Sequence, residues 1–181
     1  PFGPVLNRSP RAGAASLVGG LDIGVGQVGG GAIACAVAGL VVGTLSMADL
    51  TGKISSGMFT LAGGSYALTL LVATVVIILL GMGMPTPAVY ALSAVLAAPA
   101  LLALKIELLP AHLFIVYFAS MSAITPPVAV AAFAAASIAR ANPIAVAFVA
   151  CRVGIVAFVL PLVFVNQPGL LLMGDAATVV T

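Results

Sequence analysis

Long stretches without any charged residue constrain this 181-residue chain more than any other feature. Charged residues make up only 6% of the sequence, whereas soluble domains carry about 25%. This composition excludes a soluble globular domain, and the repeated apolar runs exclude a secreted protein with a single apolar leader. Four segments lack Asp, Glu, Lys and Arg, and each reaches the roughly 20 residues that cross a bilayer as a helix. These segments are 23–48, 54–104, 108–139 and 153–174. The sequence therefore predicts an all-α integral membrane protein.

Few residues could carry acid–base, metal or nucleic-acid chemistry. A net charge of +2, scattered along the chain, is too small for a nucleic-acid surface. Cys35 and Cys151 both lie in apolar runs, so we expect small buried residues and neither a disulfide nor a metal site. His112 has no second His, Cys or carboxylate at ligand spacing, which predicts an interfacial or packing histidine. We expect no cofactor and no enzymatic activity.

Gly, Pro and the few charged residues divide the chain into segments. Because the chain starts at Pro1 and not at an initiator Met, we expect it to be a piece of a longer protein. The predicted order is a surface or interfacial segment (1–27), a scaffold transmembrane helix (28–50), an interfacial arm (51–64), a helical hairpin (65–104), a discontinuous transmembrane helix (111–140), a transmembrane helix (143–165) and a C-terminal tail (166–181).

The predicted hairpin turns at the sequence GMGMPTP, residues 81–87. Two Gly and two Pro within seven residues end one helix and turn the chain. A turn at the membrane surface usually carries charged or strongly polar residues, and this one offers only Thr86. A turn packed inside protein at membrane depth fits better, since irregular backbone is tolerated there only in protein or beside a cavity. Both arms are long enough to span, so re-entry and two full crossings remain open.

A second interruption, Ser122 to Pro127, falls near the middle of segment 111–140. Pro126 and Pro127 remove two backbone donors, and Pro126 disfavours helical backbone at Thr125. A single Pro would indicate a kink, whereas this Pro pair after Ser and Thr predicts true unwinding.

Two broken apolar segments with hydroxyls beside Gly or Pro indicate a transporter binding site. Unwinding frees carbonyl oxygens, and helix C-termini carry partial negative charge, so the breaks can surround a hard cation such as sodium. Helix N-termini at the same breaks can offer N–H groups to an anionic substrate. Neither 54–104 nor 108–139 contains a carboxylate, which counts against a proton relay. The alternative is that both segments are kinks that only shape packing.

These two motifs are also where the chain resembles a known family. The runs LLGMGMPTPAVYALSAVLAAPALL (79–102) and AHLFIVYFASMSAITPPVAVAAFAAASIARANP (111–143) are similar to the large, DctM-like membrane subunit of TRAP transporters, the tripartite ATP-independent periplasmic transporters. The resemblance covers residues 30–172 and is closest to the fused permeases that work with TAXI-type binding proteins. It implies half of an inverted-repeat elevator-type ion transporter fold, with a re-entrant helical hairpin and a discontinuous helix.

The resemblance also implies a sodium site between the hairpin tip and the helix break, and no other metal site. Thr86 and Thr125 would offer hydroxyls to this site, and neighbouring residues would offer backbone carbonyls. Pro87 departs from the small or hydroxylated residue expected after the tip Thr, which leaves the local tip geometry open. The implied residues are Gly81, Gly83, Pro85 and Thr86 at the tip, and Ser122, Thr125, Pro126 and Pro127 at the break.

The expected function is sodium-coupled uptake of small organic anions, in particular carboxylates, across a bacterial or archaeal cytoplasmic membrane. The implied partners are a periplasmic TAXI-type solute-binding protein, a small membrane subunit that can be fused to the chain, the missing N-terminal repeat and the lipid bilayer. Arg8, Arg11 and Arg140 share one side of the predicted topology, which places the N-terminus inside and the C-terminus outside. The alternatives are proton coupling in the same fold, a membrane-embedded enzyme and a structural membrane subunit.

Overall fold

The computed structural model describes residues 10–171, which form eight α-helices and a short 3-10 helix and contain no strand. This arrangement confirms the all-α fold class. The elements are α1 (Pro10–Met47), α2 (Leu50–Leu61), α3 (Tyr66–Leu80), α4 (Thr86–Ala103), α5 (Leu108–Met121), α6 (Val130–Ala139), α7 (Pro143–Val153), α8 (Ile155–Asn166) and the 3-10 helix η1 (Pro168–Leu171).

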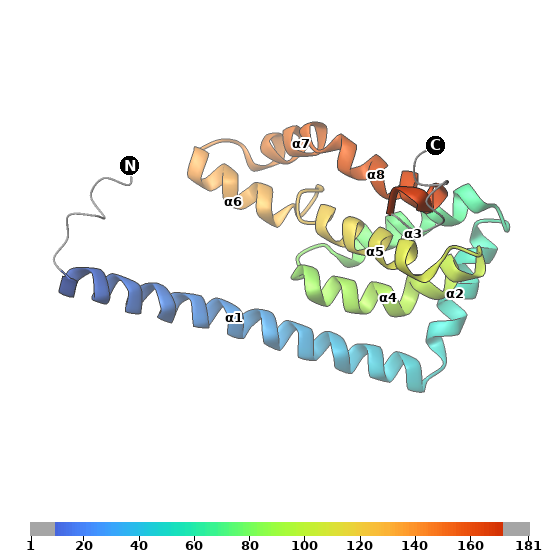
Figure 1. Cartoon of the computed structure of the whole chain (residues 1–181), viewed down its shortest axis with the longest axis horizontal. Helices are drawn as coiled ribbons and strands as arrows, with labels where there is room; N and C mark the ends of the chain where they lie inside the picture. Colours follow the sequence, from blue (N-terminus) through green and yellow to red (C-terminus); the bar gives the residue numbers. More distant parts are fainter. Residues whose placement is uncertain (1–9, 172–181) are drawn as a thin grey trace.

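Helix α4 is central to the fold, because it contacts α1, α2, α3 and α5 (Figure 1). Helices α3 and α4 form the hairpin, α5 packs against both of its arms, and α8 packs on α5. Helix α1 runs along one edge of the molecule and extends beyond the rest (Figure 1). The core therefore lies between the hairpin and α5. Its largest fully buried side chains include Phe114, Phe118, Ile77, Leu101, Ile115 and Val89.

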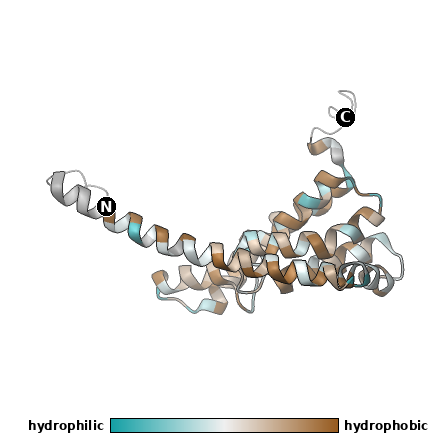
Figure 2. Ribbon diagram, turned by 90° about the horizontal axis from the view of Figure 1, so that it is seen from below, coloured by the Kyte–Doolittle hydropathy of each residue, from teal (hydrophilic) through white to brown (hydrophobic). Residues whose placement is uncertain are grey.

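Large apolar side chains are exposed on many of the helices, and the ribbon in Figure 2 shows hydrophobic residues along their length. Apolar surface of this extent is unfavourable in water and rare on soluble proteins, whereas it is favourable in contact with lipid or with neighbouring membrane helices. Residues Val18–Met47 of α1 and all of α4 are long and apolar enough to cross a membrane. The pair α6 and α7 is bent by 117° at its break, and counting this pair as one span gives up to three candidate spans in the described part.

Helix α1 starts earlier than the sequence predicts. It begins at Pro10, well before the expected boundary at residue 28, so most of segment 1–27 is helical. Proline suits the first helical position, where its missing N–H costs no hydrogen bond, and glycine is frequent in membrane helices. Residues 1–9 and 172–181 lie outside the described residues, as do the orientation residues Arg8 and Asp175.

The segment expected as one helix over 143–165 consists of two helices, α7 and α8, which meet at Gly154. A Cβ at Gly154 would lie 3.1 Å from the Ala150 carbonyl oxygen and 3.4 Å from Ile124 Cδ1. The junction therefore has little space for a side chain, because the helix break in segment 111–140 packs against it.

The hairpin arms differ in length. Helix α3 has 15 residues and α4 has 18, and of the two α4 is long and apolar enough to cross a membrane by itself.

Ser55 ties the interfacial arm α2 to the hairpin. Its buried hydroxyl donates a hydrogen bond of 2.8 Å to the Leu96 carbonyl of α4. We expect Ser55→Ala to lower the free energy of unfolding by about 1 kcal/mol, because one buried hydrogen bond is lost. Ser56→Ala is the matched control, since the exposed Ser56 hydroxyl bonds only to Lys53 of its own helix. Thermal unfolding in detergent measures the stability of both variants. Equal unfolding midpoints for Ser55→Ala and Ser56→Ala would contradict this role of Ser55.

Candidate functional site

The hairpin tip is a tight turn between α3 and α4. Gly81 caps the C-terminus of α3, and Gly83 has a φ of 81°, which glycine adopts without steric cost. Pro85 is extended and precedes α4, which begins at Thr86. Pro87 lies in the first turn of α4, where a missing N–H breaks no helical hydrogen bond. The departure from the family pattern at this position is thus compatible with a regular helix start.

The helix break separates α5, which ends at Met121, from α6, which begins at Val130. The Thr125 hydroxyl donates a hydrogen bond of 2.7 Å to the Met121 carbonyl, and the Ala131 N–H donates one of 2.9 Å to the Ala123 carbonyl. Within residues 10–171, the carbonyl oxygens of Pro126 and Pro127 accept no hydrogen bond. The break is therefore truly unwound and offers free carbonyl oxygens.

The tip and the break are in direct contact. The buried Ser122 hydroxyl shares its single proton between two carbonyl oxygens, that of Ala119 at 2.7 Å and that of Gly81 at 3.3 Å. A Cβ built on Gly81 would overlap the Ser122 side chain. One on Gly83 would lie 3.8 Å from Val128 Cγ1. Two motifs that the sequence placed in separate segments are thus brought to one location.

This contact joins two helix ends of the same electrostatic sign. Gly81 is the C-cap of α3 and Ser122 is the C-cap of α5, so two helix C-termini meet there. Each C-terminus carries a partial charge of about −0.5, and two such ends repel unless a cation or a donor lies between them. The Ser122 hydroxyl supplies one donor. The arrangement favours binding of a positive charge beside it.

The other predicted residues differ in their burial. Thr86, Thr125 and Pro126 are half-buried, whereas Gly83, Pro85 and Pro127 are exposed. The Thr86 and Thr125 hydroxyls make no hydrogen bond to each other in the described structure. Of the two hydroxyls, that of Thr125 bonds to its own segment, at the Met121 carbonyl.

Two residues of the α7–α8 junction also belong to this region and were not predicted. The Cys151 thiol donates a hydrogen bond of 3.4 Å to the Ile124 carbonyl, and Gly154 lies against the Ile124 side chain. The sequence indicated only a small packing residue at Cys151. Its contact depends on the return of the chain past the break, for which the sequence carries no local signal.

His112 lies away from this contact. Its Nδ1 is 3.0 Å from the Tyr90 hydroxyl, so the pair links α5 to α4. Across residues 10–171 no group of three or more His, Cys, Asp or Glu side chains could hold a metal ion.

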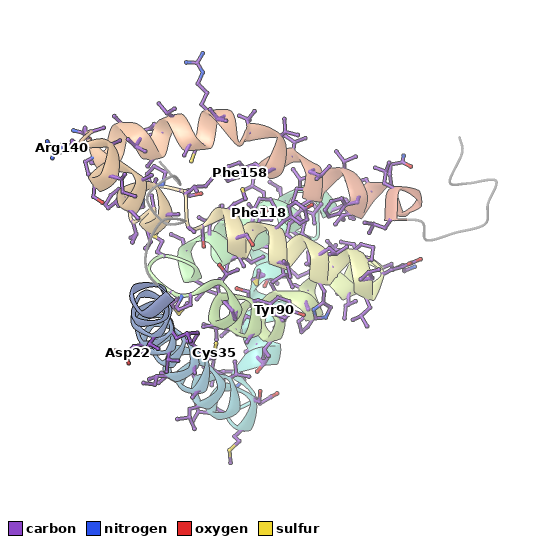
Figure 3. All side chains as sticks on the ribbon, turned by 60° about the vertical axis from the view of Figure 1, so that its left-hand side comes forward. Asp22, Cys35, Tyr90, Phe118, Arg140 and Phe158 are labelled. Carbon is purple, nitrogen blue, oxygen red and sulfur yellow. The ribbon has the colours of Figure 1, made fainter. Side chains whose placement is uncertain are left out.

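A groove of about 520 Å³ between α3, α5 and α8 is also separate from the tip and the break. Its walls include Phe118 and Phe158, with Thr74 and Asn166 as polar members (Figure 3). An open groove with this apolar lining suits a lipid chain or a neighbouring helix and not a small charged solute.

An unwound helix packed against an uncharged hairpin tip, in a fold with an apolar exterior, is typical of a membrane transporter. The chain belongs to the family described as "Tripartite ATP-independent periplasmic transporter, DctM component", whose sequence model matches residues 24–177. No curated protein and no solved structure compared with the chain gives a match.

Family membership confirms the resemblance to the large TRAP subunit. The chain is therefore a membrane permease subunit of the TRAP transporter type, a multi-pass protein of the inner membrane, and not an enzyme. The family also implies a periplasmic binding protein and a small membrane subunit as partners.

Proposed function

We propose that this chain contributes a sodium site to a permease that takes up small organic anions, in particular carboxylates. A TAXI-type periplasmic protein would deliver the solute, and the small membrane subunit would be fused to the full-length permease. The observation that carries the proposal is the hydrogen bond between Ser122 and Gly81, which joins the C-termini of α3 and α5. A first inverted repeat would complete the transport domain.

The atoms that could coordinate an ion at this contact are all oxygens, which suits a sodium ion. Two helix C-termini supply negative potential, and the Pro126 and Pro127 carbonyls are free to coordinate. The Thr125 hydroxyl directs its proton to Met121, so its lone pairs remain available to a cation. Thr86 adds a second half-buried hydroxyl at the tip.

The same geometry supports an anionic solute. Helix α4 begins at Thr86 and α6 begins at Val130, each only a few residues beyond the contact. Helix N-termini offer backbone N–H groups and positive potential, which suit a carboxylate. Because Ser122 holds the tip against the break, the hairpin and the broken helix would move as one unit with the solute.

Sodium should stabilise the protein against heat more than potassium does at equal ionic strength. A ligand that binds only the folded state at a hundred times its Kd adds about 2.7 kcal/mol to the unfolding free energy. Thr125→Val should abolish this difference, because it removes a hydroxyl oxygen beside the contact. Thr74→Val is the matched control, since Thr74 is also half-buried but lines the separate groove on α3.

The comparison of unfolding midpoints in sodium and potassium distinguishes sodium coupling from the alternatives. Equal midpoints in the two cations would reject the sodium site and point to proton coupling in the same fold. If Thr125→Val and Thr74→Val reduce the sodium-dependent stabilisation equally, the effect is general destabilisation. This result would also reject Thr125 as a ligand of the sodium ion. If the sodium effect is specific, solutes can be screened by uptake with the binding protein present.

A further inference from the structure

Helix α7 turns back over α6 and contacts both ends of the helix break (Figure 1). Before the proline pair, the Cys151 thiol donates a hydrogen bond of 3.4 Å to the Ile124 carbonyl. After the pair, the fully buried Ala147 belongs to the same packed cluster as Ala129, the residue that precedes α6. One helix therefore bridges the unwound segment from Ile124 to Ala129.

The face of α7 that meets the break carries small residues. Cys151 and Gly154 are three positions apart and lie on one side of the helix, with Ala147 a turn before Cys151. A Cβ at Gly154 would lie 3.4 Å from Ile124 Cδ1, whereas the large Phe148 side chain on α7 is 64% exposed. Small side chains let helix backbones approach closely. Both the carbonyl and the side chain of Ile124 therefore meet the same turn of α7.

The peptide group between Ile124 and Thr125 is held at both of its ends. Its N–H belongs to Thr125 and donates to the carbonyls of Met121, at 3.1 Å, and Ser122, at 3.3 Å. Its carbonyl accepts the hydrogen bond from Cys151, the only donor that reaches this oxygen in the described part of the chain. Because a peptide group is planar, contacts at both ends fix its orientation.

This peptide group comes directly before the free carbonyls of the break. The carbonyls of Ala123 and Thr125, on either side of Ile124, accept backbone N–H groups from their own segment. The Ile124 carbonyl is instead bonded from another helix. A rotation of its peptide group would change the direction of the chain that follows, and with it the direction of the Pro126 and Pro127 carbonyls.

We propose that Cys151 is a positioning residue for the sodium site. Its thiol holds the Ile124 carbonyl toward α7, and this contact sets the direction in which the free Pro126 and Pro127 carbonyls face the ion. Gly154 supports the same peptide group by leaving room for the Ile124 side chain. The inference rests on the proposed function, because it assigns a role in binding the same ion.

Cys151→Ala in the intact permease tests this role. Sodium chloride replaces potassium chloride at constant ionic strength, and the thermal midpoint gives the sodium concentration for half-maximal stabilisation. Cys151→Ala should raise this concentration about fivefold, because the Ile124 carbonyl loses its only donor. Cys151→Ser keeps a donor and should retain most of the wild-type affinity. Cys35→Ala is the matched control, since Cys35 is also a free, partly buried cysteine but lies on α1 (Figure 3).

Alkylation of the unsubstituted permease with N-ethylmaleimide gives a second readout that requires no variant to fold. Cys151 is partly exposed, and peptide mass spectrometry measures its modification separately from that of Cys35. Sodium should slow the modification of Cys151 relative to potassium, because a bound ion holds the break against α7. The modification of Cys35 should be the same in both salts.

The outcomes distinguish a failure of this inference from a failure of the sodium site. Unchanged or tighter sodium binding in Cys151→Ala would overturn the role of Cys151 and leave the sodium site standing. Equal midpoints of the wild type in the two salts would reject the sodium site and this inference with it. A purely structural residue would lower both midpoints equally, and that result would also contradict the proposal. If Cys151→Ala does not fold, equal alkylation of Cys151 in the two salts would overturn it.

Discussion

Gly81→Ala should separate the hairpin tip from the helix break, and adding Ser122→Gly should restore their contact. A Cβ at Gly81 would overlap both the hydroxyl and the Cβ of Ser122. A change of rotamer can move the hydroxyl but not the Cβ, so the backbone of one segment has to shift. Overpacking of this kind costs roughly 1–3 kcal/mol. We expect Gly81→Ala to lower the unfolding midpoint and to remove the sodium-dependent stabilisation.

The double variant makes this prediction specific to the contact. Ser122→Gly alone loses the one hydroxyl proton that the Ala119 and Gly81 carbonyls share, but it creates the space that an alanine at position 81 requires. The two substitutions should therefore compensate, so that the double variant is more stable than Gly81→Ala. Gly57→Ala on α2 is the control, because a Cβ there meets nothing within 4 Å. Additive losses in the double variant, or equal effects of Gly81→Ala and Gly57→Ala, would rule out the steric contact.

Phe114→Ala should cause the largest loss of stability among the core substitutions considered. Phe114 is 0% exposed and meets Phe118 edge-to-face, with ring centroids 4.8 Å apart. Removal of a buried Phe typically costs about 3–5 kcal/mol, because the cavity is filled only partly by relaxation. Inside a membrane the lost van der Waals contacts remain the main contribution, since lipid is as apolar as the core.

Phe148→Ala separates burial from residue type. Phe148 is the same residue on α7 but is 64% exposed, so its truncation leaves no internal cavity. We expect a large fall in the thermal midpoint for Phe114→Ala and little change for Phe148→Ala. Similar midpoints for the two variants would show that the packing of α5 against the hairpin does not limit stability.

The sequence predicted the helix breaks better than the helix ends. Gly83 and Pro85 determine a turn through their own backbone preferences, and Pro126 and Pro127 lack the donors that a continuous helix needs. These effects are local, so the motifs alone located both interruptions. Helix α1, in contrast, extends back to Pro10, because glycines that indicate a loop in soluble proteins are tolerated in membrane helices.

The family resemblance implied that the two motifs share a site, but the atomic contacts between them could not be read from the chain alone. Gly81 and Ser122 are 41 positions apart, and Cys151 is 27 positions from Ile124. These contacts depend on how α5 packs against the hairpin of α3 and α4 and on how α7 returns past the break. No local sequence pattern specifies this packing. The sequence likewise showed no reason for a helix junction at Gly154, where the break comes close to the backbone.

The sequence by itself determined that this chain is an all-α membrane protein with two unwound segments. The long uncharged runs and the missing N–H groups of the prolines are local properties of the chain, so they need no tertiary contact to take effect. The family match was also a property of the sequence. Only the tertiary structure decided that the C-termini of α3 and α5 meet, with Ser122 against Gly81. The physical reason is that the electrostatic potential at this point is the sum of the contributions from the two helix C-termini. The distance between these termini depends on packing between segments that are remote in the chain.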